Sequence, residues 1–222
     1  DNIDGCSLCG NKNANNLGLR RKTNWLKERY ADGLRYKVLR SEKFGDIGMI
    51  EYAPGSHAWR PVWAEGYLVI HCLWVKGEHK GKGLGKLLLE SCLKDAKKSN
   101  CRGVAVVTSS DSLMAESDLF LKAGFISVVA VSLKNEASAA PYELLVKKLK
   151  KTAPDPRFIV ERERHLKKYK KGLTILAADQ CPYAAKSVER IAEASRMLLY
   201  PRCLPASCWA LTTVGPLEAG SL

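Results

Sequence analysis

The hydrophobic pattern is clearest near the middle of the chain, where a strand, a glycine-rich loop and a helix follow one another. Residues Leu68–Val75 are almost all apolar or β-branched, which is typical of a strand covered on both faces. From Lys86 to Lys98 no Gly or Pro occurs, and apolar residues recur at three- and four-residue steps. Segment 76–85, which holds four glycines, connects these two elements.

Shorter patterns predict the other elements on either side of this unit. They are a helix beginning at the N-cap-like Thr23/Asn24 and ending near Asp32-Gly33, strands over 34–39, 46–52 and 101–108, a short helix within 117–125, and strands over 126–133 and 142–146. This order predicts an α/β fold with a mixed central sheet flanked by helices. Residues 1–150 would form this domain.

The glycine-rich loop has the chemistry of an anion site. Gly81, Gly83 and Gly85 alternate, so a ligand can approach the backbone closely, and the N-terminus of the following helix attracts negative charge. The spacing excludes a Walker loop, because Leu87 replaces the required hydroxyl, and it does not fit Gly-x-Gly-x-x-Gly. The loop therefore predicts a pyrophosphate cradle. The alternative is a glycine-rich turn without a ligand.

The run Lys80-Gly81-Lys82-Gly83-Leu84-Gly85 resembles the acetyl-CoA loop of the GNAT acetyltransferase superfamily. The strand at 101–108 and the short helix ending in Gly124-Phe125 extend the resemblance. It implies a GNAT-type splayed sheet whose first strand would precede Asp1. It also implies an acetyl-CoA-dependent N-acetyltransferase acting on a small-molecule or peptide amine, with acetyl-CoA as co-substrate. The residues that would bind this co-substrate are Leu73, Trp74, Val75, Lys80, Gly81, Lys82, Gly83, Leu84, Gly85 and Lys86.

Three residues are candidates for the base that removes the amine proton, with Glu65 the weakest of them. His71 lies on the strand beside the expected thioester, and an imidazole has a suitable pKa. Glu51, on the neighbouring strand, is the second choice. The alternative for His71 is a hydrogen-bonded histidine of the core. Strand alternation predicts that the Cys72 side chain points to the face of the sheet opposite that of His71. Many members of the family place a Tyr acid where this chain has Phe120.

Two further segments have an open interpretation. The segment 53–62 carries His57, Trp59 and Arg60 and is either a wall of the acceptor site or a packed surface loop. Near the N-terminus, Cys6 and Cys9 form a single C-x-x-C pair without a second pair, so no metal site is expected.

The chain beyond residue 150 is expected to form a separate part. Segment 151–171 reads as a basic linker helix, and residues 147–171 hold eleven Lys/Arg and three carboxylates, a net charge of +8. Residues 172–222 are similar to the YoaP-like, thioredoxin-like segment of some acetyltransferases, in an incomplete form. Cys181, before a helix at 184–199, would be either a reactive or a structural thiol. No further strand is expected after residue 200.

Composition narrows the functional classes. With 46% hydrophobic residues the chain can bury a core, and no apolar run is long enough to span a membrane. The eight cysteines are scattered, so a reducing cytoplasm is expected. The net charge of +13 lies mostly in the basic segment, without nucleic-acid motifs, and no nucleic-acid partner is expected. Two alternatives to an acetyltransferase stay open. They are a non-catalytic acyl-CoA-binding module, which Phe120 favours, and a monothiol redox protein acting through Cys181.

Overall fold

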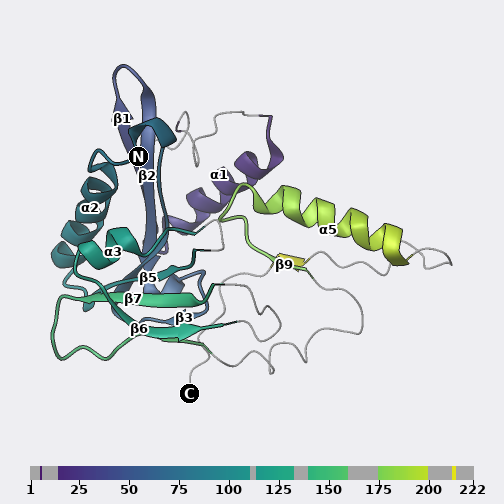
Figure 1. The fold of residues 1–222 in the computed structure, drawn as a ribbon. Coiled ribbons are helices and arrows are strands. Elements are labelled where there is room, and N and C mark those ends of the chain that lie inside the picture. The colour runs from purple at the N-terminus through teal and green to yellow at the C-terminus, as the bar shows by residue number, and fades with distance from the viewer. Residues whose placement is uncertain are drawn as a thin grey trace.

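A six-stranded sheet forms the centre of the protein (Figure 1). The computed structural model describes residues 6, 15–110, 114–132, 140–159, 175–199 and 212–213. The strand order is β1-β2-β4-β5-β7-β6. The strands are β1 Arg35–Ser41, β2 Gly45–Pro54, β4 Tyr67–Val75, β5 Gly103–Thr108, β6 Ile126–Val131 and β7 Tyr142–Lys148. Only β4 and β5 run parallel among these neighbours, so the predicted mixed α/β sheet is confirmed.

Helices cover both faces of the sheet (Figure 1). Helix α2, Leu84–Lys98, and the short α3, Asp118–Lys122, pack on one face, where Leu89 and Phe120 are fully buried. Helix α1, Leu17–Arg29, packs on the opposite face. A fully buried leucine contributes about 2 kcal/mol relative to an exposed one, so these apolar stripes hold the helices in place.

The central strands separate part-way along their length. The parallel register of β4 and β5 runs from Tyr67↔Gly103 to Ile70↔Val106 and ends there. Strand β4 nevertheless continues to Val75, paired only with β2 on its other side. The segment 71–75 of β4 therefore has one edge without a strand partner, as the expected splay requires.

A β-bulge lies at this separation. Glu51 of β2 pairs with Cys72 of β4, but the next residue, Tyr52, pairs with Ile70. His71 is thus the extra residue, without a ladder partner on β2 or β5. The prediction that His71 and Cys72 point to opposite faces is wrong, because the bulge interrupts the alternation. Cys72 packs with the α1 cluster, and His71 faces Glu51 on that same side.

Helix α1 begins about two turns earlier than the sequence pattern predicts. Its first residue is Leu17, and the side chain of Asn16 accepts a hydrogen bond from the Leu19 N–H at 3.1 Å. Asn16 is therefore the N-cap. The proposed cap residue, Thr23, lies inside the helix, where its hydroxyl donates to the Leu19 carbonyl at 2.9 Å. A cap-like residue inside a helix misled the sequence interpretation because its hydroxyl can bond the preceding turn instead.

Residues after 150 return to the sheet domain. Strand β8, Arg157–Phe158, pairs with β3, Val62–Trp63, and the Tyr67 hydroxyl donates to the Pro154 carbonyl at 2.9 Å. Ala153 is buried there. The remainder of the predicted basic linker, 160–171, lies outside the described residues, and so do Cys9 and the loop 133–139. The division of the chain at residue 150 stays a prediction.

The C-terminal part contains a short strand and a long helix. Helix α5, Ala184–Leu199, has the predicted bounds, and strand β9 covers Leu176–Ala177. Strand β10, Thr212–Thr213, pairs parallel with β9, so the expectation of no strand after residue 200 is wrong. The thioredoxin-like resemblance of this part stays a prediction. No helix within the described ranges is both long and apolar enough to cross a membrane.

The N-cap of α1 gives a direct test of the corrected helix boundary. Replacing Asn16 with Ala should lower the free energy of unfolding by about 1 kcal/mol, because a first-turn N–H loses its acceptor. Replacing Thr23 with Ala should have a smaller effect, since its hydroxyl caps nothing. Urea unfolding of both variants measures the difference. A larger loss for Thr23→Ala would contradict the boundary at Asn16.

Candidate functional site

The glycine-rich loop keeps its backbone accessible. After the 3₁₀ turn η2, Gly77–His79, the chain takes left-handed conformations at Gly81 (φ +76°) and Gly83 (φ +78°), which favour glycine. Gly83 is also the N-cap of α2 and offers no side chain to the first-turn N–H groups. A Cβ atom on Gly83 would meet no atom within 4 Å, so this backbone faces open space.

Three lysines lie in the loop or at the start of the helix that carries these N–H groups. Lys80, Lys82 and Lys86 are exposed, and the helix N-terminus adds its positive dipole end. Gly85 differs from the other two glycines, because its Cβ would lie 3.2 Å from the side chain of Leu119. The loop therefore has the backbone and the charge that a bound pyrophosphate needs.

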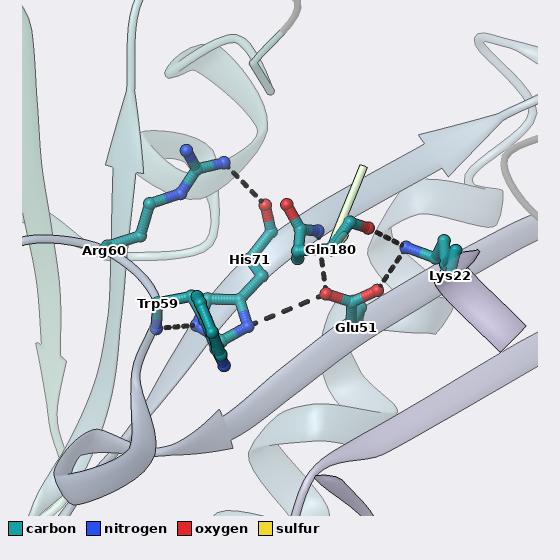
Figure 2. A network of polar contacts seen from close by, with 6 residues as sticks. All are labelled: Lys22, Glu51, Trp59, Arg60, His71 and Gln180. Atoms are coloured by element: carbon teal, nitrogen blue, oxygen red, sulfur yellow. Dashed lines mark hydrogen bonds and ion pairs between the residues drawn. The ribbon is translucent and has the colours of Figure 1, made fainter. Parts of the chain in front are cut away.

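His71 is held in one tautomer by the loop that precedes β3. The Trp59 N–H donates to Nε2 of His71 at 3.0 Å, and Nδ1 lies 3.7 Å from Oε1 of Glu51 (Figure 2). Since Nε2 accepts a hydrogen bond, the proton of the neutral ring lies on Nδ1, facing the carboxylate. Burial lowers the pKa of His71 below its usual 6.5, although Glu51 opposes this shift. His71 is therefore neutral at pH 7, and its one basic nitrogen is occupied.

Glu51 lies at the centre of a buried polar network. Its side chain is fully buried, and Nζ of Lys22, also fully buried, lies 2.6 Å from Oε2. Nε2 of Gln180 donates to Oε1 at 2.7 Å, and Lys22 also donates to the Gln180 carbonyl at 2.6 Å (Figure 2). Burial alone would raise the pKa of Glu51, but Lys22 and His71 outweigh it and lower the pKa to about 2. The carboxylate is thus ionised and matched by one lysine.

Two members of this network, Lys22 and Gln180, escaped the sequence analysis. From sequence alone, a lysine in an amphipathic helix is assigned to the exposed face. Only the tertiary contact with Glu51 shows that Lys22 is buried and paired. Gln180 comes from the part of the chain that was expected to be separate. Its segment touches α1 closely, because a Cβ on Gly18 would lie 1.9 Å from the Pro182 carbonyl oxygen.

The loop 53–62 contacts His71, and its role as a wall of the acceptor site stays a prediction. It leaves β2, forms the 3₁₀ turn η1, Gly55–His57, and brings Trp59 and Arg60 to His71. Nη2 of Arg60 donates to the His71 carbonyl at 3.1 Å. The indole of Trp59 packs edge-on against Trp25, with ring centroids 5.4 Å apart.

The other candidate residues lie further from this network or lack the expected chemistry. Phe120 is fully buried and packs edge-on against Phe125, so it is a core residue. Cys181 is half-buried, and its carbonyl accepts from the Ala184 N–H at the start of α5. Its reactivity stays a prediction. Within the described part of the chain, no group of three or more metal-ligand side chains comes together.

Comparison with known proteins identifies the domain that carries this site. The profile of the Acetyltransferase (GNAT) family matches residues 21–125. Residues 21–125 are thus similar to a GNAT acetyltransferase domain. The uncharacterized N-acetyltransferase YoaP of Bacillus subtilis (strain 168) is 33% identical over 175 residues, which are 78% of this chain and 65% of that protein. The chain therefore spans less than two thirds of the length of this relative.

Solved structures with a similar GNAT fold share little sequence with the chain. The structure of yncA from Salmonella typhimurium, with its cofactor acetyl-CoA, is 20% identical, covers 61% of this chain and 77% of that one, and has a TM-score of 0.47. Ribosomal-protein-alanine N-acetyltransferase from Brucella melitensis is 22% identical, covers 59% and 78%, and has a TM-score of 0.46.

The buried pair of Lys22 and Glu51 predicts a large effect on stability. Glu51→Gln should lower the free energy of unfolding by about 3–5 kcal/mol, because Lys22 keeps a buried charge without a counter-ion. The double variant Lys22→Met/Glu51→Gln should recover much of this loss. Chemical denaturation of the wild type, both single variants and the double variant measures it, and additive losses would contradict the pairing.

The same pair predicts the direction of a pH dependence. The pKa of Glu51 is about 2 in the folded protein against an ordinary 4.5, so its stabilisation is complete above pH 4.5. It should be lost progressively as the pH falls from 4.5 towards 2. Glu51→Gln should show a shallower loss of stability over this range than the wild type.

Proposed function

We propose that the chain is an acetyl-CoA-dependent N-acetyltransferase, which transfers an acetyl group from the thioester to an amine of a small molecule or a peptide. The observation that carries this proposal is the unpaired edge of β4, which leads directly into the accessible backbone at Gly81 and Gly83. A strand edge and a helix N-terminus in this order suit a ligand with an amide-containing arm and a pyrophosphate.

The geometry supports one direction for the coenzyme. Its pyrophosphate would bind the backbone of residues 80–86, and its pantetheine arm would run back along Leu73–Val75 like an added strand. At about 3.3 Å per residue, the distance from Val75 to His71 is about 13 Å, which brings the thioester close to the bulge. Free N–H groups of the bulged strand would then polarise the thioester carbonyl.

His71 is the proposed base, acting through Nε2. This nitrogen accepts a hydrogen bond from the Trp59 N–H, so it becomes available when the acceptor amine or a water molecule takes the place of that N–H. Glu51 would hold the Nδ1 proton and stabilise the imidazolium that forms, as a carboxylate does in other acid–base pairs. Glu51 itself is fully buried and ion-paired, which favours this supporting role over that of a direct base.

A second candidate function is an acyl-CoA-binding module without turnover. Phe120 favours it, since a buried phenyl ring cannot protonate the departing thiolate. Thiol release from acetyl-CoA in the presence of amines, measured beside coenzyme A binding by calorimetry, separates the two functions. Binding without any amine-stimulated release would support the module. A redox role of Cys181, a cytoplasmic location and a separate C-terminal part remain further proposals.

The cradle predicts that Gly83 is indispensable for coenzyme binding. Gly83→Val should abolish coenzyme A binding, because a β-branched side chain disfavours the left-handed conformation and would fill the open space in front of the backbone. Gly77→Val is the matched control, since Gly77 has no positive φ and a Cβ there also meets nothing within 4 Å. Calorimetry with coenzyme A compares them. Equal affinity of both variants would overturn the cradle.

The proposed base predicts a specific pH profile. Since burial lowers the pKa of His71, the acidic limb of kcat/KM should lie below pH 6.5. His71→Gln should lower kcat by at least about a hundredfold and remove this limb, because general-base catalysis contributes 10²–10⁴-fold. Its side-chain oxygen can still accept from the Trp59 N–H, so coenzyme A binding should survive. An unchanged kcat in His71→Gln would show that His71 has only a structural role.

A further inference from the structure

One charge beside the site has no counter-ion among the residues that the structure describes. The Arg60 side chain is mostly buried, and its guanidinium donates a single hydrogen bond, from Nη2 to the His71 carbonyl. No carboxylate of the described residues lies within ion-pair distance of it. Figure 2 shows the other terminal nitrogen pointing away from the Lys22–Glu51 network. A guanidinium has five N–H donors in a planar fork, so most of its donors remain available.

The neighbouring groups do not neutralise this charge. Glu51 is the acidic residue that influences Arg60 among its neighbours Cys72, Cys181 and Tyr142. Glu51 is already matched by Lys22 at 2.6 Å. His71 is neutral. The site therefore carries one uncompensated positive charge on a largely desolvated side chain, which favours an anionic ligand.

The position of Arg60 indicates which ligand this is. The carbonyl that holds Arg60 belongs to His71, the first residue of β4 beyond its pairing with β5. The coenzyme would approach this point from the glycine loop at the other end of the unpaired segment, and its anionic groups would stay near residues 80–86. An anion at Arg60 would therefore belong to the acceptor.

We propose that Arg60 forms a subsite for a carboxylate of the acceptor, which would make the acceptor an amine with a carboxylate a few bonds from its nitrogen. The inference rests on the proposed function, because the acceptor nitrogen must reach the thioester beside His71. The planar fork matches a carboxylate through two parallel hydrogen bonds. α-Amino acids and short ω-amino acids have this separation of nitrogen and carboxylate.

The test compares matched acceptors with and without the charge. The probes are the common L-amino acids and β-alanine, each beside its carboxamide, with thiol release from acetyl-CoA as the measurement. We expect kcat/KM for the best acids to exceed that for their amides by at least about tenfold, as expected for hydrogen bonds to a charged group. Arg60→Met should remove this preference, so that the ratio of kcat/KM for each acid to kcat/KM for its amide falls to about one. Arg60→Lys should retain part of it.

Two controls make the outcome decisive. Arg157→Met removes an exposed arginine of β8 and should preserve the preference. The Tm of the protein saturated with coenzyme A provides a readout independent of turnover, and it should rise with the acids and not with the amides. Equal loss for acids and amides in Arg60→Met would overturn the subsite, since Arg60 would then act on the thioester or support the His71 backbone.

The proposed function and the subsite can fail separately. Turnover confined to amines without a carboxylate would overturn the subsite and retain the acetyltransferase. A rise in Tm with acids, lost in Arg60→Met, without any thiol release would retain the subsite and overturn the acetyltransferase. If no acid is turned over and no acid raises the Tm, the subsite is overturned.

Discussion

The separation of β4 from β5 after Ile70 is the constraint on which the site depends. It leaves the residues 71–75 with one unpaired edge, and the bulge at His71 frees that residue from both ladders. The His71 backbone and ring can therefore bind Arg60 and Trp59 instead of a neighbouring strand. A regular continuous pairing of β4 with β5 would remove the edge and the histidine arrangement together.

The buried ion pair fixes the chemistry on one side of this separation. Lys22 comes from α1, Glu51 from β2 and Gln180 from the segment before α5, so three distant parts of the chain meet at one carboxylate. Each buried charge needs its partner, because desolvation penalises an unpaired ion strongly. The network thus couples the position of α1 and of the C-terminal segment to the tautomer of His71.

The contrast between Glu51 and Arg60 explains how one site can serve two purposes. Glu51 is fully buried and fully matched, and it acts on His71 without meeting a ligand. Arg60 lies on a connecting loop, keeps most of its donors available and has no matched carboxylate in the described part of the chain. The first arrangement suits the positioning of a catalytic group, and the second suits recognition.

The sequence by itself determined the central strand, the glycine-rich loop and the helix that follows it. The apolar run at 68–75, the alternating glycines and the helix after them are local features, and local backbone preferences decide them. It also placed His71 and Glu51 on adjacent strands. Only the tertiary structure decided the bulge, because a run that is apolar at both odd and even positions shows no alternation for an extra residue to interrupt. The partners Lys22 and Gln180 are 29 and 129 residues from Glu51, and no periodicity reports a contact over such separations.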